Sequence, residues 1–270
     1  MIGKGTAVAF LCVVSAAGCK TATNYLDPSG PVYRGSSDSA APEFKDIRVV
    51  TFNIEFGVHV DGAIAALAGH PALRGADIVA LQEMDAPGVE KVAAALHMNY
   101  VYYPVSLNPK YGRDFGNALL SPWPIEDSRK ILLPHASRFL KQGRAAVTAR
   151  VWIAGRVVQV YCLHLISPFG GSPGSRRDQA DVVLADARNV EGPVIVAGDF
   201  NTHGLGDRFE AAGFSWPTRD VGDSVRGFSF DHVFVRGLRL EGTEAGVARE
   251  VRASDHRPVW VALSPAGASP

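Results

Sequence analysis

The chain has 270 residues, 47% of them hydrophobic, and its 27 Lys and Arg balance its 27 Asp and Glu. This length and composition are enough for one large α/β domain or two small ones, and they exclude a mainly disordered chain. A neutral chain also argues against a protein that holds nucleic acid mainly through a strong overall positive field, although a local basic cleft is still open to it.

The first 19 residues, MIGKGTAVAFLCVVSAAGC, have the pattern of a secretory signal peptide. Lys4 precedes an apolar stretch that is too short to span a bilayer as a helix, and small residues then lead to Cys19. This end resembles the bacterial lipoprotein box, in which such a cysteine is lipidated. We therefore expect residues 1–18 to be removed and Cys19 to anchor an exported protein at a membrane, on the periplasmic face or the cell surface. Plain secretion is the alternative.

Residues 20–44 are rich in Ser, Ala, Pro and Gly and have no apolar periodicity. With Cys19, residues 19–45 are therefore expected to form a lipidated, flexible tether. The folded domain is predicted at residues 46–264, with a short C-terminal tail at 265–270. Cys162 has no expected disulfide partner and is predicted to be a small buried residue.

Short β-branched runs alternate with Ala-rich segments of helical spacing through this domain. Ala154-Gly155 joins two of these runs and predicts a hairpin. So many strands without a second domain boundary predict an α/β fold of two mixed sheets with helices outside. The expected strands are 47–53, 77–83, 99–105, 116–121, 145–153, 156–165, 193–199, 230–235 and 258–263, and the expected helices are 61–69, 88–97 and 176–189.

Polar side chains recur where these strands begin or end. In VAGDFNT (196–202), Asp199 and Asn201 are two positions apart and would share one side if the extended geometry continues. Each such residue alone is explained as a turn former or a solvated side chain, but together they indicate a site. The other positions are Asn53, Gln82, Glu83, His164, Asp231, His232, Asp255 and His256.

The residue types at these positions favour a particular chemistry. Oxygen donors suit Mg²⁺ or Mn²⁺, which keep waters for the phosphate oxygens of a substrate. Zinc is disfavoured because the sequence has neither HExxH nor a Cys/His cluster. The histidines would supply donors to phosphate oxygens and a group that transfers protons near neutral pH.

The stretches TFNIEFG, DIVALQEMD, FGNALLSPWPI, GRAAV, CLHLISP, SRRDQADVVL, VIVAGDFNT, FDHVFV and SDHRPVW occur in this order. Together they resemble the endonuclease/exonuclease/phosphatase superfamily, which includes deoxyribonuclease I and neutral sphingomyelinases. The resemblance covers residues 46 to about 263. It implies a deoxyribonuclease I-like, four-layer α/β sandwich with the active site at one rim of the two sheets.

The resemblance also implies a role for each polar position. Asn53 and Glu83 would hold the metal, with Asp255 close to it. Asp199 and Asn201 would activate or orient the attacking water and contact the phosphate. His164 and His256 would bind phosphate oxygens, with Asp231 paired to His256, while Arg144 and Asn117 match positions near the phosphate. The general base is either Asp199, which we favour, or the Asp231–His256 pair. Glu55 replaces an aspartate of the abasic-site enzymes, so no second metal role is expected there.

We therefore predict an exported, monomeric, Mg²⁺- or Mn²⁺-dependent phosphodiesterase, whose substrate is nucleic acid or a phospholipid head group. Exposed aromatic residues would suit a lipid substrate, and Phe169, Trp216 and Phe228 are the candidates, although each such residue is more often part of ordinary packing. A phosphomonoesterase and a non-catalytic binding lipoprotein of the same fold are the alternatives. A serine hydrolase built on GGSPG (170–174) is disfavoured, because it needs the N–H of the residue after the serine and Pro173 has none.

Overall fold

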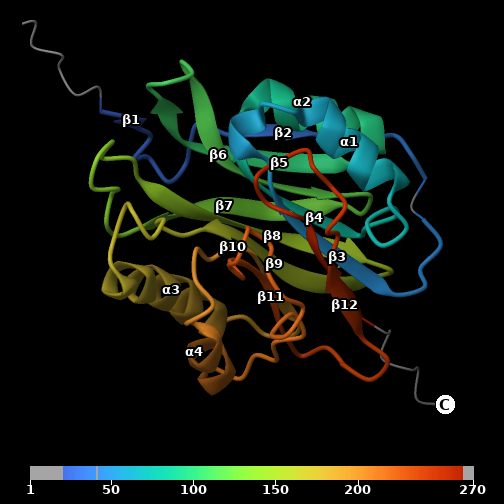
Figure 1. Cartoon of the computed structure of the whole chain (residues 1–270). Helices are drawn as coiled ribbons and strands as arrows, with labels where there is room; N and C mark the ends of the chain where they lie inside the picture. The colour runs from blue at the N-terminus through green and yellow to red at the C-terminus, as the bar shows by residue number, and fades with distance from the viewer. Residues whose placement is uncertain (1–20, 41, 264–270) are drawn as a thin grey trace, which may run out of the picture.

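The computed structural model describes residues 21–40 and 42–263. Two β-sheets pack face to face, with a helical layer outside each (Figure 1). The first sheet contains β1 (Thr23–Asn24), β2 (Tyr33–Gly35), β3 (Ile47–Asn53), β4 (Ile78–Met84), β5 (Asn99–Asn108), β6 (Arg113–Ser121), β12 (Glu244–Val247) and β13 (Val259–Leu263). The second contains β7 (Ile125–Leu133), β8 (Arg144–Ile153), β9 (Arg156–His164), β10 (Val194–Asp199) and β11 (Asp231–Arg236).

The strand order is β1-β5-β6-β4-β3-β13-β12 in the first sheet, where β2 also pairs with β5, and β11-β10-β9-β8-β7 in the second. The first sheet is covered by α1 (Val60–Gly69) and α2 (Ala86–Leu96), and the second by α3 (Pro173–Arg188) and the short α4 (Gly206–Ala211). A 3-10 turn, η1 (Glu55–Gly57), follows β3. This arrangement confirms the predicted four-layer α/β sandwich.

The central strands are apolar on both faces because both faces are covered. In β4, Ile78 and Ala80 pack between the two sheets, whereas Val79 and Leu81 pack under the helices. The same alternation separates Ile195 from Val194 and Val196 in β10. Successive side chains of a strand point to opposite faces, so one continuous apolar run contributes both to the core between the sheets and to a core under the helices.

The segment GGSPG runs directly into α3. Ser172 caps this helix, because its Oγ accepts a hydrogen bond from the Ser175 backbone N–H at 3.1 Å. The hydroxyl of Ser172 is thus used in helix capping, which removes the structural basis for a serine nucleophile at this position.

The expected hairpin at Ala154-Gly155 is confirmed, because β8 and β9 pair antiparallel up to Ile153↔Arg156. Cys162 is buried, as predicted. Strands β7 and β12 and helix α4 were not expected from the sequence. The sequence of β7, IEDSRKILL, shows no clear alternation of apolar and polar residues. The reason is that β7 is an edge strand and exposes several charged side chains.

The prediction of a flexible tether over residues 19–45 is wrong for much of its described part. Thr23 pairs with Leu107 and Tyr33 pairs with Tyr102, so both short strands extend the first sheet along β5. Between them, Lys130 Nζ donates to the Gly30 carbonyl oxygen at 2.7 Å. Edge pairing and side-chain-to-backbone bonds order this segment without any apolar periodicity.

The predicted signal peptide, Cys19 and the tail at 265–270 lie outside the described residues. Within the described ranges, none of the helices combines the length and the apolar character needed to cross a bilayer.

The close approach of β9 and β10 requires glycine at position 198. A Cβ atom there would lie 2.0 Å from the Leu163 carbonyl oxygen, and the φ of Gly198 is +156°. We expect Gly198→Ala to lower the free energy of unfolding by about 1–3 kcal/mol, as overpacking does. Gly69→Ala, where nothing lies within 4 Å, should change it by less than about 1 kcal/mol. Denaturant melts of both variants check this, and equal stabilities would contradict it.

Candidate active site

Strand register brings the predicted polar residues together at one rim of the sandwich. In the second sheet, Asp199 is the residue opposite His164 in β9 and opposite Asp231 in β11. In the first sheet, Asn53 lies at the end of β3 beside Gln82 in β4. Asn53 Nδ2 donates to Asp199 Oδ2 at 3.1 Å and so joins the two sheets at this rim.

A pocket of about 410 Å³ opens at this rim. Seven predicted residues line it, and aromatic side chains form much of the remaining wall. The predicted residues are Glu83, Arg144, His164, Asp199, Asn201, Asp255 and His256, and the aromatic residues are Phe56, Phe115, Phe169, Phe228 and Phe230.

His256 lies between two buried carboxylates. Its Nδ1 is 2.7 Å from Asp231 Oδ2, and its Nε2 is 3.7 Å from Asp199 Oδ2. Burial alone would lower the pKa of His256, but the charges of Asp231 and Asp199 raise it to about 10. The imidazole is therefore protonated at neutral pH and acts as a hydrogen-bond donor.

Asp199 is a buried carboxylate with several polar contacts. Its Oδ1 accepts the Asn201 backbone N–H at 2.8 Å, and its Oδ2 lies 3.4 Å from His164 Nε2. Burial raises the pKa of Asp199 to about 7, against the opposing charge of His256. Asp199 can therefore exchange a proton near neutral pH.

Glu83 is a largely buried carboxylate with no Lys or Arg nitrogen within 4 Å among the described residues, although the charges of Arg144 and His256 act on it from farther away. Its side chain is 15% exposed, and its Oε2 accepts the Phe56 backbone N–H at 3.2 Å. Its nearest basic group among the described residues is His164, 3.9 Å away. Burial lowers the pKa of His164 well below its ordinary value, so this imidazole is neutral. Burial also raises the pKa of Glu83.

A divalent cation fits beside Glu83, because it would pair directly with a buried oxygen donor that no Lys or Arg contacts among the described residues. Among the described residues, Asn53 Oδ1 accepts one hydrogen bond, from the Glu55 backbone N–H at 3.1 Å, and so keeps a free lone pair. Asp255 is exposed at the edge of the same pocket. The three predicted metal positions are therefore compatible with Mg²⁺ or Mn²⁺.

Asp199, Asp231 and His256 also place one ligand atom each within 4.8 Å of one another. In this second group the protonated His256 pairs with Asp231 at 2.7 Å. A cation there would compete with the imidazolium for the two carboxylates, so the Glu83 side of the pocket is the better candidate for a metal.

Three further predicted residues differ in their placement. Arg144 lines the pocket, and its guanidinium lies 5.3 Å from the centre of the Phe115 ring. Asn201 also lines it, although its φ of +53° shows that the extended backbone ends there. Asn117 does not line the pocket. Its Nδ2 donates to the Ala145 carbonyl oxygen at 2.8 Å, and this hydrogen bond connects β6 to β8. The prediction that Asn117 is a phosphate contact thus gains no support.

Several pocket residues were not found from the sequence. Gln142 lines the pocket and accepts from Arg144 Nη1 at 3.3 Å, but no motif marks it. Of the three aromatic candidates, Phe169 and Phe228 are exposed, whereas Trp216 is buried and is part of ordinary packing. Trp216 packs instead on Phe234, with ring centres 5.2 Å apart.

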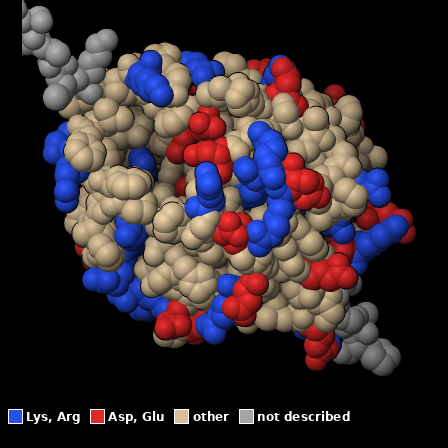
Figure 2. All heavy atoms as spheres, viewed as in Figure 1, with Lys and Arg blue, Asp and Glu red and all other residues tan. Residues whose placement is uncertain are grey.

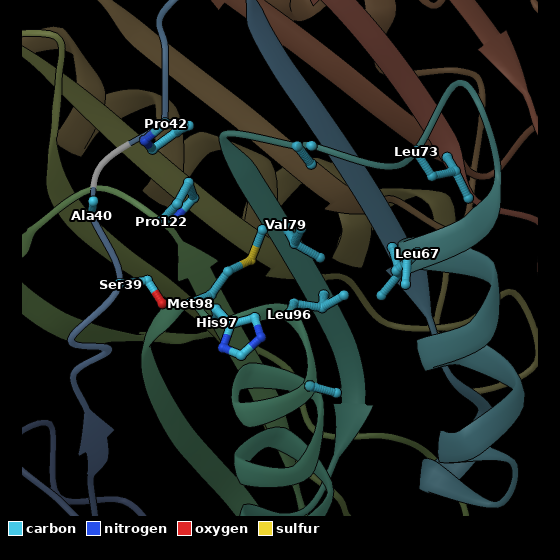
Figure 3. A pocket seen from close by; sticks show the side chains of 14 residues that line it. Ser39, Ala40, Pro42, Leu67, Leu73, Val79, Leu96, His97, Met98 and Pro122 are labelled. Atoms are coloured by element: carbon cyan, nitrogen blue, oxygen red, sulfur yellow. The ribbon is translucent and has the colours of Figure 1, made fainter.

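A second pocket, of about 350 Å³, lies between α1, β4 and the end of α2 (Figure 3). Its wall is almost wholly apolar, and His97 is its single ionisable side chain. Apart from His97, the described residues of this pocket therefore offer no side chain for proton transfer or metal binding.

The sequence model of a protein family, described as "Endonuclease/Exonuclease/phosphatase family", matches residues 50–256 of the chain. Among curated proteins, a UPF0294 protein of Vibrio cholerae is 33% identical over 135 residues, and this match spans 46% of each protein, so the chain covers less than half of that relative. Among solved structures, an endonuclease/exonuclease/phosphatase from Beutenbergia cavernae is 22% identical with a TM-score of 0.67, covering 83% of this chain and 73% of that one. Sphingomyelinase C from Streptomyces griseocarneus is 17% identical with a TM-score of 0.61, covering 82% and 100%.

Proposed function

Because the chain belongs to the endonuclease/exonuclease/phosphatase family, whose members hydrolyse phosphoric esters, we propose that it is a metal-dependent phosphodiesterase. The observation that carries this proposal is the pairing of two unlike carboxylates across one pocket. Asp199 has a pKa raised to about 7 beside a protonated imidazole, while Glu83 is a buried carboxylate without a Lys or Arg in direct contact among the described residues, which suits a cation.

Each residue of the pocket would have a defined task. Glu83 and Asn53, with Asp255 at the edge, would hold the cation, which when bound neutralises charge on the phosphate oxygens. Asp199 would accept a proton from the attacking water, because His256 is already protonated and cannot. His256 Nε2–H would then donate to a phosphate oxygen, and Asp231 would keep its ring in that orientation.

Two features bear on the substrate. The aromatic walls of the pocket can contact an organic group on each side of the phosphorus, which favours a diester over a monoester. Basic and acidic side chains are interspersed over the face shown in Figure 2, with no continuous basic band for a long nucleic-acid backbone. A phospholipid head group or a short nucleic acid is the substrate class that these features support.

The test compares bis-p-nitrophenyl phosphate with p-nitrophenyl phosphate in Mg²⁺, in Mn²⁺ and in EDTA. The diester should be hydrolysed with a kcat/KM at least about tenfold higher, and EDTA should abolish turnover. A preference for the monoester would instead indicate a phosphomonoesterase. Loss of both activities, together with no metal-dependent thermal shift, would indicate a binding protein.

The proposed roles fix the pH dependence. Asp199 must be deprotonated and His256 protonated, so kcat/KM should rise with pH up to about 7, form a plateau and fall near pH 10. A bound cation would move the acidic limb lower, because it stabilises the carboxylate. Measurement of kcat/KM at saturating Mg²⁺ checks this profile. Activity that decreases between about pH 6 and pH 8 would show that a protonated Asp199 is required.

Export and membrane anchoring through Cys19 remain part of the proposal, supported by the sequence alone. In a bacterial host that lipidates such cysteines, Cys19→Ser should move the protein from the membrane fraction to the soluble fraction. Cell fractionation followed by immunoblotting checks this, with Cys162→Ser as the control because Cys162 is buried. A wild-type protein found only in the soluble fraction would contradict the lipid anchor.

A further inference from the structure

An exposed apolar pair stands on a loop beside the active-site pocket. This RFLK loop, Arg138–Lys141, presents Phe139 at 68% and Leu140 at 37% exposure between two exposed basic residues. The loop is closed at its base, because Ser137 N–H donates to the Gln142 carbonyl oxygen at 2.8 Å. Its apolar side chains are therefore held outward by an ordered turn.

The RFLK loop continues into the rim of the pocket. Arg138 N–H donates to the Gly170 carbonyl oxygen at 2.8 Å, and the neighbouring Phe169 is 86% exposed. Phe169 lines the pocket together with Phe228, which is 57% exposed and stacks on Phe230 with ring centres 5.1 Å apart. Exposed apolar side chains therefore extend from the loop to the pocket mouth.

The described chain begins at this same face. Ala22 N–H donates to the Leu140 carbonyl oxygen at 2.8 Å, and Asn24 Nδ2 donates to the Lys141 carbonyl oxygen at 2.8 Å. In Figure 1, β1 and the loops that follow β7 and β9 lie on one side of the molecule. Residues 1–20 are thus connected to the chain next to the RFLK loop.

We propose that this face docks on the surface of a lipid bilayer, with the pocket mouth turned toward the head groups. Phe139, Leu140 and Phe169 would enter the interface between head groups and acyl chains, where aromatic and aliphatic side chains are favourable. Arg138 and Lys141 would pair with anionic head groups at the same depth. Docking goes beyond the proposed function, because it requires no chemistry at Asp199.

Binding to vesicles tests the proposal in the full chain, with Cys12→Ser and Cys19→Ser in every variant so that no lipid is attached. A nitrobenzoxadiazole dye is coupled at Phe139→Cys or, as the matched control, at Trp152→Cys. Trp152 is 38% exposed at the opposite end of β8, and Cys162 is buried away from the dye. Vesicles contain phosphatidylcholine alone or with phosphatidylglycerol.

When vesicles are added, the fluorescence emission of the dye at position 139 should shift to shorter wavelength, and the shift should be larger with phosphatidylglycerol. The emission of the dye at position 152 should not shift. Without dye, Phe139→Ser/Leu140→Ser should bind vesicles at least about tenfold more weakly than Trp152→Ser. This double variant should still hydrolyse bis-p-nitrophenyl phosphate like the wild type, because neither residue lines the pocket.

Equal shifts at both positions, or no shift at position 139, would overturn the docking proposal. The emission of the dye at position 139 could instead shift without vesicles as the protein concentration rises. This result would overturn the docking proposal, because it would show that the surface contacts another copy of the chain. Failure of the proposed function would be recognised separately, as absence of turnover with vesicle binding intact.

Discussion

Asp199→Asn is expected to lower kcat/KM for bis-p-nitrophenyl phosphate at least about 100-fold, the usual cost of losing a proton acceptor that also stabilises charge in the transition state. The amide keeps the shape of the carboxylate and an oxygen that can accept the Asn201 N–H. What the variant loses is the ability to take a proton from water, so the loss should appear in kcat more than in KM.

Stability measurements separate this loss from unfolding. The pKa of Asp199 is raised in the folded protein from 3.8 to about 7, so its contribution to stability is present below the unfolded pKa and is lost as pH rises through about 7. At pH 8 in EDTA, Asp199→Asn should therefore unfold no earlier than the wild type. Asp220→Asn, at an exposed carboxylate, is the matched control and should keep full activity. Near-normal activity of Asp199→Asn would refute the assignment of the base.

Glu83→Gln is expected to weaken Mg²⁺ binding at least about tenfold and to lower kcat/KM by about 100-fold or more, because the buried negative charge that selects the cation is removed. Among the described residues, the one basic nitrogen within 4 Å of a Glu83 carboxylate oxygen belongs to His164, which is neutral. The glutamine should also fold at least as well without metal, because burial already raises the pKa of Glu83.

Glu55→Gln is the matched control for this second prediction. Glu55 lies two residues past Asn53 and is not a lining residue of the pocket, so its variant should bind Mg²⁺ within about threefold of the wild type. Isothermal titration with Mg²⁺ and Mn²⁺ measures both variants. Unchanged affinity in Glu83→Gln would place the metal elsewhere, and the group of Asp199, Asp231 and His256 would be the next candidate.

The sequence was sufficient for the layers and for most of the site, because both depend on local patterns. The runs that became β3, β4 and β10 are apolar on both faces, so only a covered sheet could accommodate them. Polar residues at the ends of parallel strands must then meet at one edge, which brought His164 and Asp199 together.

Other features depended on contacts that no local pattern encodes. The pairing of residues 23–24 and 33–35 with β5 uses backbone atoms at a sheet edge, which any polar sequence can supply. Asn117 resembles a pocket residue in its motif, but its amide is used to bridge the two sheets. Trp216 packs on Phe234 and also lies against Gly206 of α4, a helix whose six residues carry too little periodicity to be recognised.

The measurement that tests the central claim most directly is the initial rate of bis-p-nitrophenyl phosphate hydrolysis by the wild type and by Asp199→Asn, each in Mg²⁺ and in EDTA. We predict turnover in the wild type with Mg²⁺ alone, with the other three rates at least about 100-fold lower. Equal rates in EDTA would contradict the metal at Glu83, and equal rates in Asp199→Asn would contradict the proton acceptor on which the proposed phosphodiesterase rests.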